Sequence, residues 1–322
     1  MSALIRTILL IGAGQLGSRY LQGLAKFELP LNIYVYDIHS ESLMVAERRW
    51  SEVFKAEIGH KVAFSTALDS VAPLVDIAIV ATTADVRPKA LAEACKHSCV
   101  RYWILEKVLA QSECDLNEIQ ACINTDGRAW VNTPRRMMPW HQQIRSQLCL
   151  TQPMTLKVAG GSWGLACNSV HFLDLLSWWS GETLQEVKTG RLDSNWFQSK
   201  RPGNWEIGGT LEARFSGGSR ALLIANAGGS AGYSMQVSDG KLSWEINEAL
   251  GFALRSDGIS IGGRLPYQSE MSADLVAGIL ATGECALPTL LESTALHRVF
   301  IRSMQEHWQR TGHPDATFVP IT

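Results

Sequence analysis

The sequence predicts two domains of different class: a doubly wound α/β domain with a parallel sheet over residues 1–128, and an α+β domain with a largely antiparallel open sheet over residues 129–322. Three observations predict them. The chain has 322 residues, enough for about two domains. Before Pro134, short apolar runs alternate with amphipathic stretches, as strands and helices around a parallel sheet do. After Pro134, helical patterns become rare and glycine-rich turns separate the apolar runs.

The elements before Pro134 follow from hydrophobic periodicity. Apolar runs suited to strands covered by helices on both faces lie at Thr7–Ile11, Ile33–Tyr36, Val62–Phe64, Asp76–Thr82, Tyr102–Leu105 and Ala129–Asn132. Amphipathic stretches predict helices at Gln15–Phe27, Glu41–Lys55, Arg87–Lys96 and Glu113–Ile123. Ser112 precedes the last of these and is expected to be its N-cap.

The second domain is expected to hold a strand meander and two helices. Strand-like runs lie at Thr210–Phe215, Ala221–Asn226, Tyr233–Val237, Leu242–Ile246 and Phe252–Arg255, with glycine pairs or Asp-Gly at the turns between them. One helix is expected at Val170–Trp179, ended by Gly181. A second is expected at Leu290–Gln309, where Thr289 and Glu292 form a capping-box pattern.

Composition excludes several classes of protein. Lys plus Arg number 29 and Asp plus Glu 31, so the formal charge is -2 and the pI is about 6.5. A balanced chain has no basic field for a phosphate backbone, so we expect no nucleic-acid partner. Apolar residues make up 46% of the chain, yet no run approaches the ~20 residues that span a bilayer. We therefore expect a globular protein without a membrane partner.

The seven cysteines contain no Cys-x-x-Cys pair, and most have apolar neighbours. This pattern predicts buried, reduced thiols and hence a reducing compartment. The apolar run Thr7–Ile11 is short and leads directly into a glycine turn, which favours a buried strand over a secretory signal. We therefore expect a cytoplasmic protein, and the cysteine spacing predicts no metal site.

The segment that follows the first strand carries the glycine pattern Gly12-x-Gly14-x-x-Gly17, between a strand and a helix. In that context Gly12 permits a tight turn, Gly14 lets the backbone approach a pyrophosphate, and Gly17 allows close helix packing. Gln15 and Leu16 begin the helix, whose N-terminal N–H groups favour an anion. The pattern predicts a Rossmann site for a dinucleotide; a glycine turn without ligand is the alternative.

Asp37 ends the second strand, 25 residues after Gly12. A carboxylate at that point accepts hydrogen bonds from ribose hydroxyls and repels a 2′-phosphate. The three residues after it, Ile38–Ser40, carry no Lys or Arg. We therefore expect NAD as the cofactor, with NADP disfavoured. The alternative is that Asp37 only caps the following helix.

Two later strand ends are expected at the same edge of the parallel sheet, where ligands bind. One carries Thr82 and Thr83, and the other carries Glu106 and Lys107. A charged pair that closes an apolar strand is best explained by a position facing a ligand. We therefore expect Thr82, Thr83, Glu106 and Lys107 to bind the cofactor. A mutual surface salt bridge between Glu106 and Lys107 is the alternative.

With these residues in place, the chain resembles the Gfo/Idh/MocA family of NAD(P)-dependent oxidoreductases over nearly its whole length. That family has a glycine turn, a threonine-rich end to the fourth strand, Glu-Lys-Pro followed by Leu-Ala, and a helix with His-x-x-Asp-Leu. The corresponding segments here are Gly12–Gly17, Thr82-Thr83, Glu106–Ala110 and His171–Leu175. The resemblance implies an antiparallel second domain that holds the substrate.

The chain departs from the family pattern at three positions. Val108 replaces the family's Pro, Cys167 replaces the Asp four residues before the helix His, and Arg87 stands roughly where the family often has a His. The resemblance implies that His171 is the proton acceptor and that Lys107 hydrogen-bonds the reacting oxygen.

Further residues are candidates for binding the substrate. We expect Asn168 to orient the substrate or the imidazole, and Asp174 to be a structural partner. Arg136 suits an anionic group, and Trp163 offers an aromatic face to a sugar ring. The alternatives are that His171 is a structural residue, that Arg135 and Arg136 are a solvated pair, and that Trp163 only packs in the core.

These residues predict an NAD-dependent oxidoreductase that transfers a hydride between nicotinamide and a hydroxyl or carbonyl of a sugar-like small molecule. One alternative is a catalytically silent dinucleotide-binding regulator on the same scaffold; another is a reductase of a nonsugar carbonyl or imine. A homodimer or homotetramer joined through the sheet of the second domain is expected, since apolar residues alternate along Thr210–Arg255.

Overall fold

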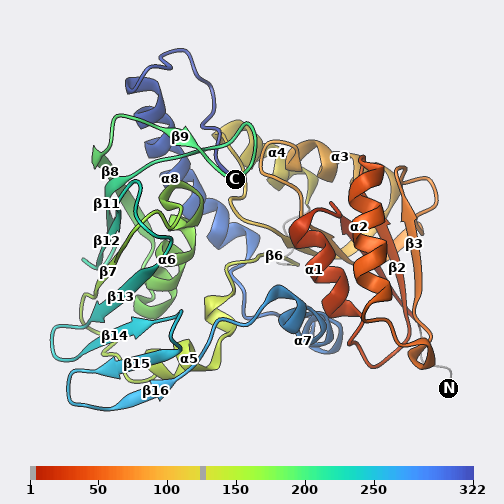
Figure 1. Cartoon of the computed structure of the whole chain (residues 1–322), viewed down its shortest axis with the longest axis horizontal. Helices are drawn as coiled ribbons and strands as arrows, with labels where there is room; N and C mark the ends of the chain where they lie inside the picture. Colours follow the sequence, from red (N-terminus) through yellow and green to blue (C-terminus); the bar gives the residue numbers. More distant parts are fainter. Residues whose placement is uncertain (1–4, 124–127) are drawn as a thin grey trace. The chain divides into compact units, whose positions relative to one another are not determined.

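A computed structural model describes residues 5–123 and 128–322 of the chain. They form two compact units made of interleaved segments (Figure 1). The first unit contains Met1–Glu106, Asn117–Asn132 and Pro266–Leu290, and the second contains Lys107–Leu116, Thr133–Leu265 and Leu291–Thr322. The chain thus passes between the units several times, whereas the sequence suggested one boundary after residue 128.

The first unit is built on a six-stranded parallel sheet in the order β3-β2-β1-β4-β5-β6. Its strands are β1 (Arg6–Ile11), β2 (Leu31–Tyr36), β3 (Lys61–Ser65), β4 (Leu74–Val80), β5 (Cys99–Leu105) and β6 (Ala129–Val131). The strand order reverses between β1 and β4, which is the doubly wound topology that the sequence predicts. Ligands of such sheets bind beyond the carboxyl ends of the strands at this reversal.

The helices associated with this sheet are α1 (Gln15–Leu24), α2 (Ser40–Ser51), α3 (Arg87–His97) and α4 (Glu113–Cys122), with a 3₁₀ turn η1 (Ala56–Ile58). Ser112 caps α4 as predicted, because its hydroxyl accepts the Asp115 N–H at 3.1 Å. A later helix, α7 (Gln268–Thr282), packs against α1 (Figure 1). Gly23 permits this close approach, since a Cβ there would lie 2.6 Å from Cβ of Ser272.

The second unit holds an eight-stranded mixed sheet in the order β16-β15-β14-β13-β7-β12-β11-β8. Its strands are β7 (Thr155–Gly160), β8 (Leu184–Leu192), β11 (Gly209–Phe215), β12 (Arg220–Ala225), β13 (Tyr233–Ser238), β14 (Ser243–Asn247), β15 (Phe252–Arg255) and β16 (Ser260–Gly262). The expectation of a simple meander is wrong at one place: β7 lies between β12 and β13, parallel to β12. Strand β7 was not predicted, because the alternation of its residues is only weakly apolar.

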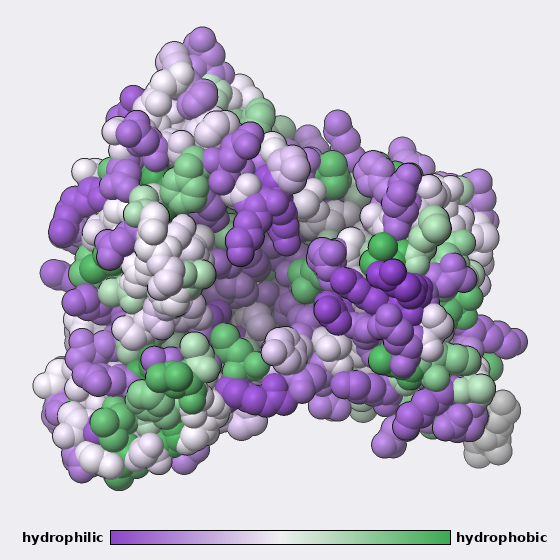
Figure 2. Space-filling view, viewed as in Figure 1, coloured by the Kyte–Doolittle hydropathy of each residue, from purple (hydrophilic) through white to green (hydrophobic). Residues whose placement is uncertain are grey.

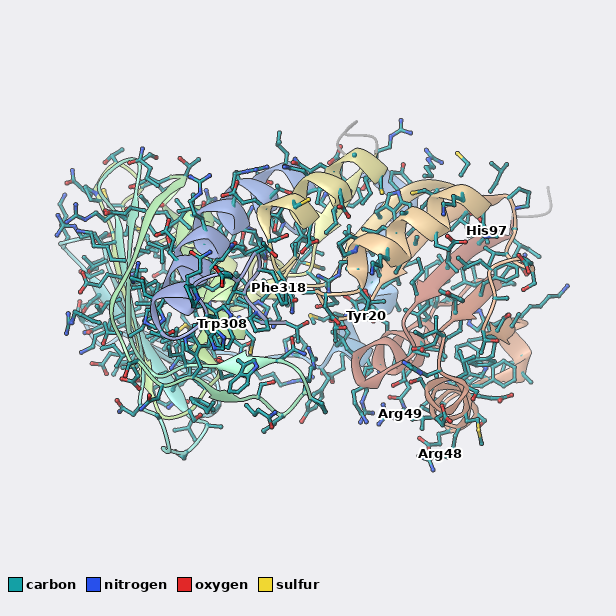
Figure 3. All side chains as sticks on the ribbon, turned by 90° about the horizontal axis from the view of Figure 1, so that it is seen from above. Tyr20, Arg48, Arg49, His97, Trp308 and Phe318 are labelled. Carbon is teal, nitrogen blue, oxygen red and sulfur yellow. The ribbon has the colours of Figure 1, made fainter. Side chains whose placement is uncertain are left out.

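Helices α6 (Leu165–Ser180) and α8 (Leu290–Arg310) cover one face of this sheet (Figures 1 and 3). Gly181 ends α6 with a φ of +74°, as predicted. The unit also contains η2 (Pro134–Met137), α5 (Pro139–Arg145) and a short hairpin of β9 (Phe197–Gln198) and β10 (Trp205–Glu206). Burial alternates along β11, β12 and β13, so the other face of the sheet carries the less buried side chains.

The seven cysteines are free thiols, as expected, but the prediction that they are buried is wrong. Three are exposed and four are half-buried. Apolar neighbours mislead here because adjacent residues on a helix face different directions: Ala94 is buried in α3, while Cys95 is exposed. No helix in the described ranges is long and apolar enough to cross a membrane.

Candidate functional site

The glycine turn after β1 is closely packed at two of its three glycines. Gly12 has a φ of +91°, and a Cβ there would lie 3.0 Å from the Thr82 nitrogen. A Cβ at Gly17 would lie 1.8 Å from the Gly12 carbonyl oxygen. Both positions therefore require glycine, Gly12 for its backbone conformation and Gly17 for the packing of α1 against the turn.

Gly14 is glycine for a different reason, because a Cβ built there meets no atom within 4 Å. It is the N-cap residue of α1, and no side chain caps the helix. Gly14 and Gln15 are exposed and Leu16 is half-buried. The first-turn N–H groups of α1 therefore point to open space, which is the arrangement that binds a phosphate or diphosphate.

The Asp37 carboxylate joins two turns at the carboxyl edge of the first sheet. Oδ2 accepts the Ala13 N–H at 2.7 Å, and Oδ1 accepts the His39 N–H at 2.9 Å. One bond fixes the glycine turn and the other fixes the entry into α2. A carboxylate has about four acceptor positions, so the half-buried Asp37 keeps capacity for further donors.

An arginine that the sequence analysis did not single out lies at the first turn of α1. Nη2 of Arg49 donates to Oε1 of Gln15 at 2.8 Å, and Nη1 donates to the Ser18 hydroxyl. Burial, followed by the nearby charges of Arg19 and Arg48, lowers the pKa of Arg49. Arg48 and Arg49 come from the last turn of α2 (Figure 3). Arg49 adds positive charge beside the N-terminus of α1.

The ends of β4 and β5 carry the other residues predicted at this edge of the sheet. Thr82 and Thr83 are half-buried; Oγ1 of Thr82 is buried without a hydrogen-bond partner in the described residues, and its carbonyl accepts a hydrogen bond from Arg87. Glu106 is buried and accepts hydrogen bonds from the Tyr20 hydroxyl at 2.7 Å and from Nδ2 of Asn132 at 2.6 Å. Burial, and then the Glu106 charge, raises the pKa of Tyr20.

Lys107 belongs to the second unit, where its ammonium group contacts the first turn of α6. Nζ donates to the Cys167 carbonyl at 3.0 Å and to Oδ1 of Asn168 at 3.2 Å. The peptide bond between Lys107 and Val108 is cis. Lys107 is thus bound to α6 and not to Glu106 in a surface salt bridge.

Lys107 and Asn168 line a cavity of about 480 Å³ that lies within the second unit. Trp163 and Gly164 contribute to its wall, as do the β9–β10 hairpin and its loop, residues 197–201 and 204–206. The structure therefore brings together three residues that the sequence analysis selected: Lys107, Asn168 and Trp163. It adds a hairpin that the sequence analysis did not select.

Two hydrogen bonds hold the predicted residues in the wall of this cavity. Nδ2 of Asn168 donates to the Trp163 carbonyl at 2.8 Å, and Nε1 of Trp163 donates to the Ile224 carbonyl at 2.8 Å. Gly164 has a φ of +81°, and a Cβ there would lie 2.9 Å from Nδ2 of Asn168. The ring of Trp163 meets the edge of Phe172 and is only 5% exposed, so it serves the core as well as the cavity.

Glu206 supplies the carboxylate at this cavity. Its oxygens accept the N–H groups of Ala166 at 2.8 Å and of Cys167 at 3.2 Å, and they thereby cap α6. Burial raises the pKa of Glu206 against the lowering effect of these hydrogen bonds and of Lys107. The family's carboxylate at position 167 is absent here, and Glu206 contacts that position from β10. No sequence spacing links two residues so far apart.

His171 lies one turn beyond Asn168 on α6 but is not among the residues lining the cavity. Its side chain is half-buried, and Nδ1 is buried without a hydrogen-bond partner in the part of the chain that the structure describes. Burial, and then the positive charges of Lys107 and Arg135, lowers its pKa well below the usual value. The imidazole is therefore neutral at neutral pH and able to accept a proton.

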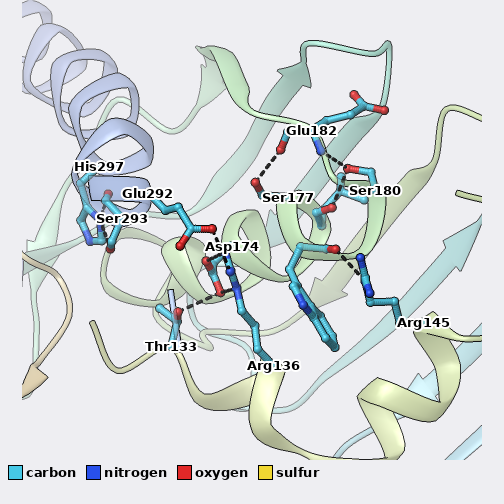
Figure 4. Close-up of polar contacts among 12 residues, drawn as sticks. Thr133, Arg136, Arg145, Asp174, Ser177, Ser180, Glu182, Glu292, Ser293 and His297 are labelled. Atoms are coloured by element: carbon cyan, nitrogen blue, oxygen red, sulfur yellow. Dashed lines mark hydrogen bonds and ion pairs between the residues drawn. The ribbon is translucent and has the colours of Figure 1, made fainter. Parts of the chain in front are cut away.

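Arg136 lies at a different cavity, of about 250 Å³, whose lining also includes Arg145, Asp174 and Trp178. Nη2 and Nε of Arg136 bind the two oxygens of Asp174 at 2.6 and 3.0 Å, and Thr133 donates to the same carboxylate (Figure 4). Arg136 is thus buried in an ion pair, not solvated, and Asp174 is its structural partner as expected. The structure does not bring Arg136 to the cavity lined by Lys107.

The neighbouring arginine is also buried in an ion pair. Arg135 binds both oxygens of Glu248 at 2.9 and 2.7 Å, and His141 contacts the same carboxylate at 2.9 Å. Burial would raise the pKa of Glu248, but Arg135 and His141 outweigh it and hold that pKa well below the usual range. Among the described residues, no group of three or more His, Cys, Asp or Glu is placed to hold a metal ion.

No protein-family model matches the chain, and no curated protein matches it. Several solved structures, by contrast, match the chain over nearly its whole length. UDP-N-acetylglucosamine 3-dehydrogenase GnnA from Acidithiobacillus ferrooxidans superposes with a TM-score of 0.68 at 12% identity, over 95% of this chain and 97% of that chain. An oxidoreductase from Agrobacterium radiobacter, in complex with NAD+, L-tartaric acid and magnesium, gives 0.70 at 12% identity, over 95% and 97%.

A third solved structure, scyllo-inositol dehydrogenase from Lactobacillus casei with bound NAD(H) and scyllo-inositol, gives a TM-score of 0.68 at 15% identity, over 95% of this chain and 98% of that chain. Identities this low establish the fold alone. The matches span both units, including the parallel sheet and the mixed sheet. The chain therefore has the fold of these solved structures, with a parallel sheet in one unit and a mixed sheet in the other, as the sequence analysis expected.

Proposed function

We propose that the protein is an NAD-dependent oxidoreductase that acts on a hydroxyl or carbonyl group of a sugar-like small molecule. The observation that carries this proposal is the glycine turn. Gly14 leaves open space at an uncapped helix N-terminus, while Gly12 and Gly17 are closely packed. A glycine at a position where a Cβ would meet nothing is best explained by the approach of a ligand to the backbone.

The residues of the first unit fit a dinucleotide. The first-turn N–H groups of Gln15, Leu16 and Gly17 would hold the diphosphate, with Arg49 beside them. Asp37 would accept hydrogen bonds from the adenosine ribose and disfavour a 2′-phosphate, so NAD is the expected cofactor and not NADP. Bound NAD supplies the hydride acceptor.

Thr82, Thr83 and Glu106 would contact the same cofactor from the ends of the neighbouring strands β4 and β5. The buried Oγ1 of Thr82, which has no partner among the described residues, has a free donor and acceptor to offer. Lys107 directly follows Glu106 in the chain and would complete this set of cofactor contacts.

The second unit would hold the substrate and move its proton. Lys107 donates a hydrogen bond to the reacting oxygen and stabilises negative charge on it, while Asn168 orients the substrate. The neutral His171 accepts the hydroxyl proton during oxidation and returns it during reduction. Burial lowers the pKa of His171 and so keeps the imidazole unprotonated, which leaves it able to accept a proton.

The direct test is a screen for NADH formation, followed at 340 nm with NAD and a panel of polyols, sugars, sugar acids and sugar nucleotides. The proposal expects turnover with at least one of them. A protein that binds NAD but reduces or oxidises no member of the panel, in either direction, would instead support a dinucleotide-binding regulator.

We also propose that the protein forms a homodimer or homotetramer through the open face of its mixed sheet. Apolar side chains gather over β14–β16 (Figure 2), where Leu250, Phe252, Leu254 and Ile259 are exposed. Exposed apolar patches of this kind mark interfaces. Light scattering at micromolar concentration tests the assembly, and a mass equal to the 35.4 kDa of one chain would contradict it.

A further inference from the structure

The cavity beside Lys107 has an excess of positive charge. Lys107, Lys200 and Arg201 line it, and Glu206 is the one carboxylate side chain in its described lining. Glu206 is 5% exposed, and its oxygens are already occupied by two backbone N–H groups of α6. Glu206 thus offsets one of the three positive charges, and cationic side chains remain in excess in the described lining.

Lys200 and Arg201 form no ion pair with any carboxylate in the described ranges. Both side chains are exposed, yet both belong to the cavity lining. The charge of Arg201 reaches the Cys167 thiol inside the cavity and lowers its pKa, against the stronger effect of burial, which raises that pKa to about 12. Its place in the lining puts Arg201 beside the cavity as well as solvent.

The loop that carries these two cations is held in shape by hydrogen bonds. The Ser199 N–H donates to the Asn204 carbonyl at 2.9 Å, and the Ser199 hydroxyl accepts the Arg201 N–H at 3.1 Å. Asn204 is buried, and its Oδ1 accepts a hydrogen bond from Gln111 at 3.3 Å. The Trp205 N–H, which follows, donates to the Pro320 carbonyl at 2.8 Å. Lys200 and Arg201 thus lie on a loop whose backbone is fixed by hydrogen bonds.

We propose that the substrate carries an oxyanion, either a carboxylate or a phosphate, and that Lys200 and Arg201 bind it. The inference rests on the proposed function and adds a substrate class to it. A neutral polyol would leave two unpaired cations at the cavity wall unused. An oxyanion gains charge-assisted hydrogen bonds from both of them, and arginine presents a fork that suits carboxylate and phosphate alike.

The aromatic side chains of the hairpin complete the expected site. Phe197 and Trp205 are half-buried in the cavity wall, and Trp205 packs against Trp308 at a ring-centroid distance of 5.7 Å. Rings held in this way offer an apolar surface to the carbon face of a sugar. The predicted arrangement therefore has the oxyanion at Lys200 and Arg201, and the reacting oxygen at Lys107.

The test is calorimetric titration of the NAD-saturated protein with three probes that share one ring: glucose, glucuronate and glucose 6-phosphate. At least one charged probe is expected to bind about tenfold more tightly than glucose. The two charged probes distinguish a carboxylate from a phosphate. If neither binds more tightly than glucose, the proposal is overturned.

Substitutions in the loop provide a second test of the proposal. Lys200→Gln and Arg201→Gln are each expected to weaken binding of the preferred charged probe about tenfold while leaving glucose binding unchanged. Lys188→Gln, a half-exposed lysine on β8 outside the cavity lining, is the matched control and is expected to change neither. Loop variants that bind the charged probe as tightly as the unmodified protein would also overturn the proposal.

Failure of this inference is separable from failure of the proposed function. NAD binding is measured first, because the glycine turn and Asp37 lie in the first unit and the loop lies in the second. A protein that binds NAD and prefers glucose would retain the oxidoreductase proposal and lose the oxyanion class. A protein that binds no dinucleotide would lose the oxidoreductase proposal, while the preference for charged probes is still measured without NAD.

Discussion

The two candidate sites of this molecule are built in opposite ways. The site of the first unit is made mainly of backbone: three glycines, the N–H groups of one helix turn, and a carboxylate that fixes the turn. The cavity of the second unit is made mainly of side chains, brought from α6, the β9–β10 hairpin and the segment at Lys107. A backbone site suits a constant ligand, whereas a side-chain site can change its ligand through a few substitutions.

The same contrast holds for charge. In the first unit the proposed anion-binding element is a helix N-terminus, which cannot be removed without removing α1. In the second unit the positive charges are Lys107, Lys200 and Arg201, and the one buried carboxylate is tied to α6. We infer that the first unit fixes the class of cofactor and that the second unit sets the choice of substrate.

The largest effect is expected for the proton-transfer residues. His171→Ala and Lys107→Ala should each reduce turnover about 10²–10⁴-fold, since each removes one positioned acid–base or electrostatic group. NAD affinity should change little in His171→Ala, because the proposed binding site for the dinucleotide is the glycine turn. The readouts are kcat, KM and the pH profile with a substrate found in the screen.

His97→Ala is the matched control, since His97 ends α3 and pairs with Glu93 on the surface (Figure 3). Full turnover in His171→Ala, with an unchanged pH profile, would show that His171 holds no proton in the reaction.

The next largest effect is the loss of stability when a buried ion pair of the second unit is broken, compared with the loss when an exposed ion pair is broken. Glu248→Gln leaves Arg135 buried without its charge partner, and the pair is 8% and 1% exposed. The free energy of unfolding should fall by about 3–5 kcal/mol. Glu212→Gln breaks the Arg191–Glu212 pair, whose side chains are 68% and 38% exposed, and should cost less than about 1 kcal/mol. Urea unfolding measures both, and equal losses would contradict the distinction.

Two glycine substitutions separate packing from ligand approach in the first unit. Gly17→Ala places a Cβ 1.8 Å from the Gly12 oxygen, so it should cost about 1–3 kcal/mol of stability and abolish NAD binding. Gly14→Ala meets open space at a φ of -60°, so stability should be nearly unchanged while NAD affinity falls. Thermal unfolding and NAD titration are the two measurements. Loss of stability in Gly14→Ala, without loss of NAD binding, would contradict the assigned role.

The pH dependence of stability provides a smaller effect. Burial lowers the pKa of His141 despite its bond to Glu248, so the folded state binds that proton less readily than the unfolded chain, whose histidines titrate near 6.5. The contribution of neutral His141 to the free energy of unfolding is therefore complete above pH 6.5. Below pH 6.5 the free energy of unfolding falls, by up to about 1.4 kcal/mol per pH unit for one such group. His141→Gln should make the fall shallower by that amount. An unchanged slope would mean that His141 is already protonated in the folded state.

The difference between the two sites also explains what could be predicted from the sequence. Gly12–Gly17 and Asp37 lie within one strand–turn–helix–strand segment, so spacing along the chain reports their contacts. Lys107 and Asn168 share a hydrogen bond across 61 positions, and only the family resemblance brought them together. Glu206 and Arg201 were missed, because nothing in residue spacing shows that a short hairpin covers the start of α6.

The elements of the fold show the same limit. All six strands of the parallel sheet were predicted, since their runs are apolar on both faces. Among the elements that were missed are β7, β8 and β16 in the second unit and α7 in the first unit. β7 is amphipathic and short, and its partners β12 and β13 lie more than 60 residues later. The helix α7 packs on α1, which no local pattern indicates.

The central claim is that the glycine turn and Asp37 hold NAD. The most direct measurement is calorimetric titration of the unmodified protein and of Asp37→Ala with NAD and with NADP. The account predicts that the unmodified protein binds NAD more tightly than NADP. It also predicts that Asp37→Ala narrows the preference, because the carboxylate no longer accepts from the ribose or repels a 2′-phosphate. Tighter binding of NADP to the unmodified protein, or no binding of either dinucleotide, would contradict it.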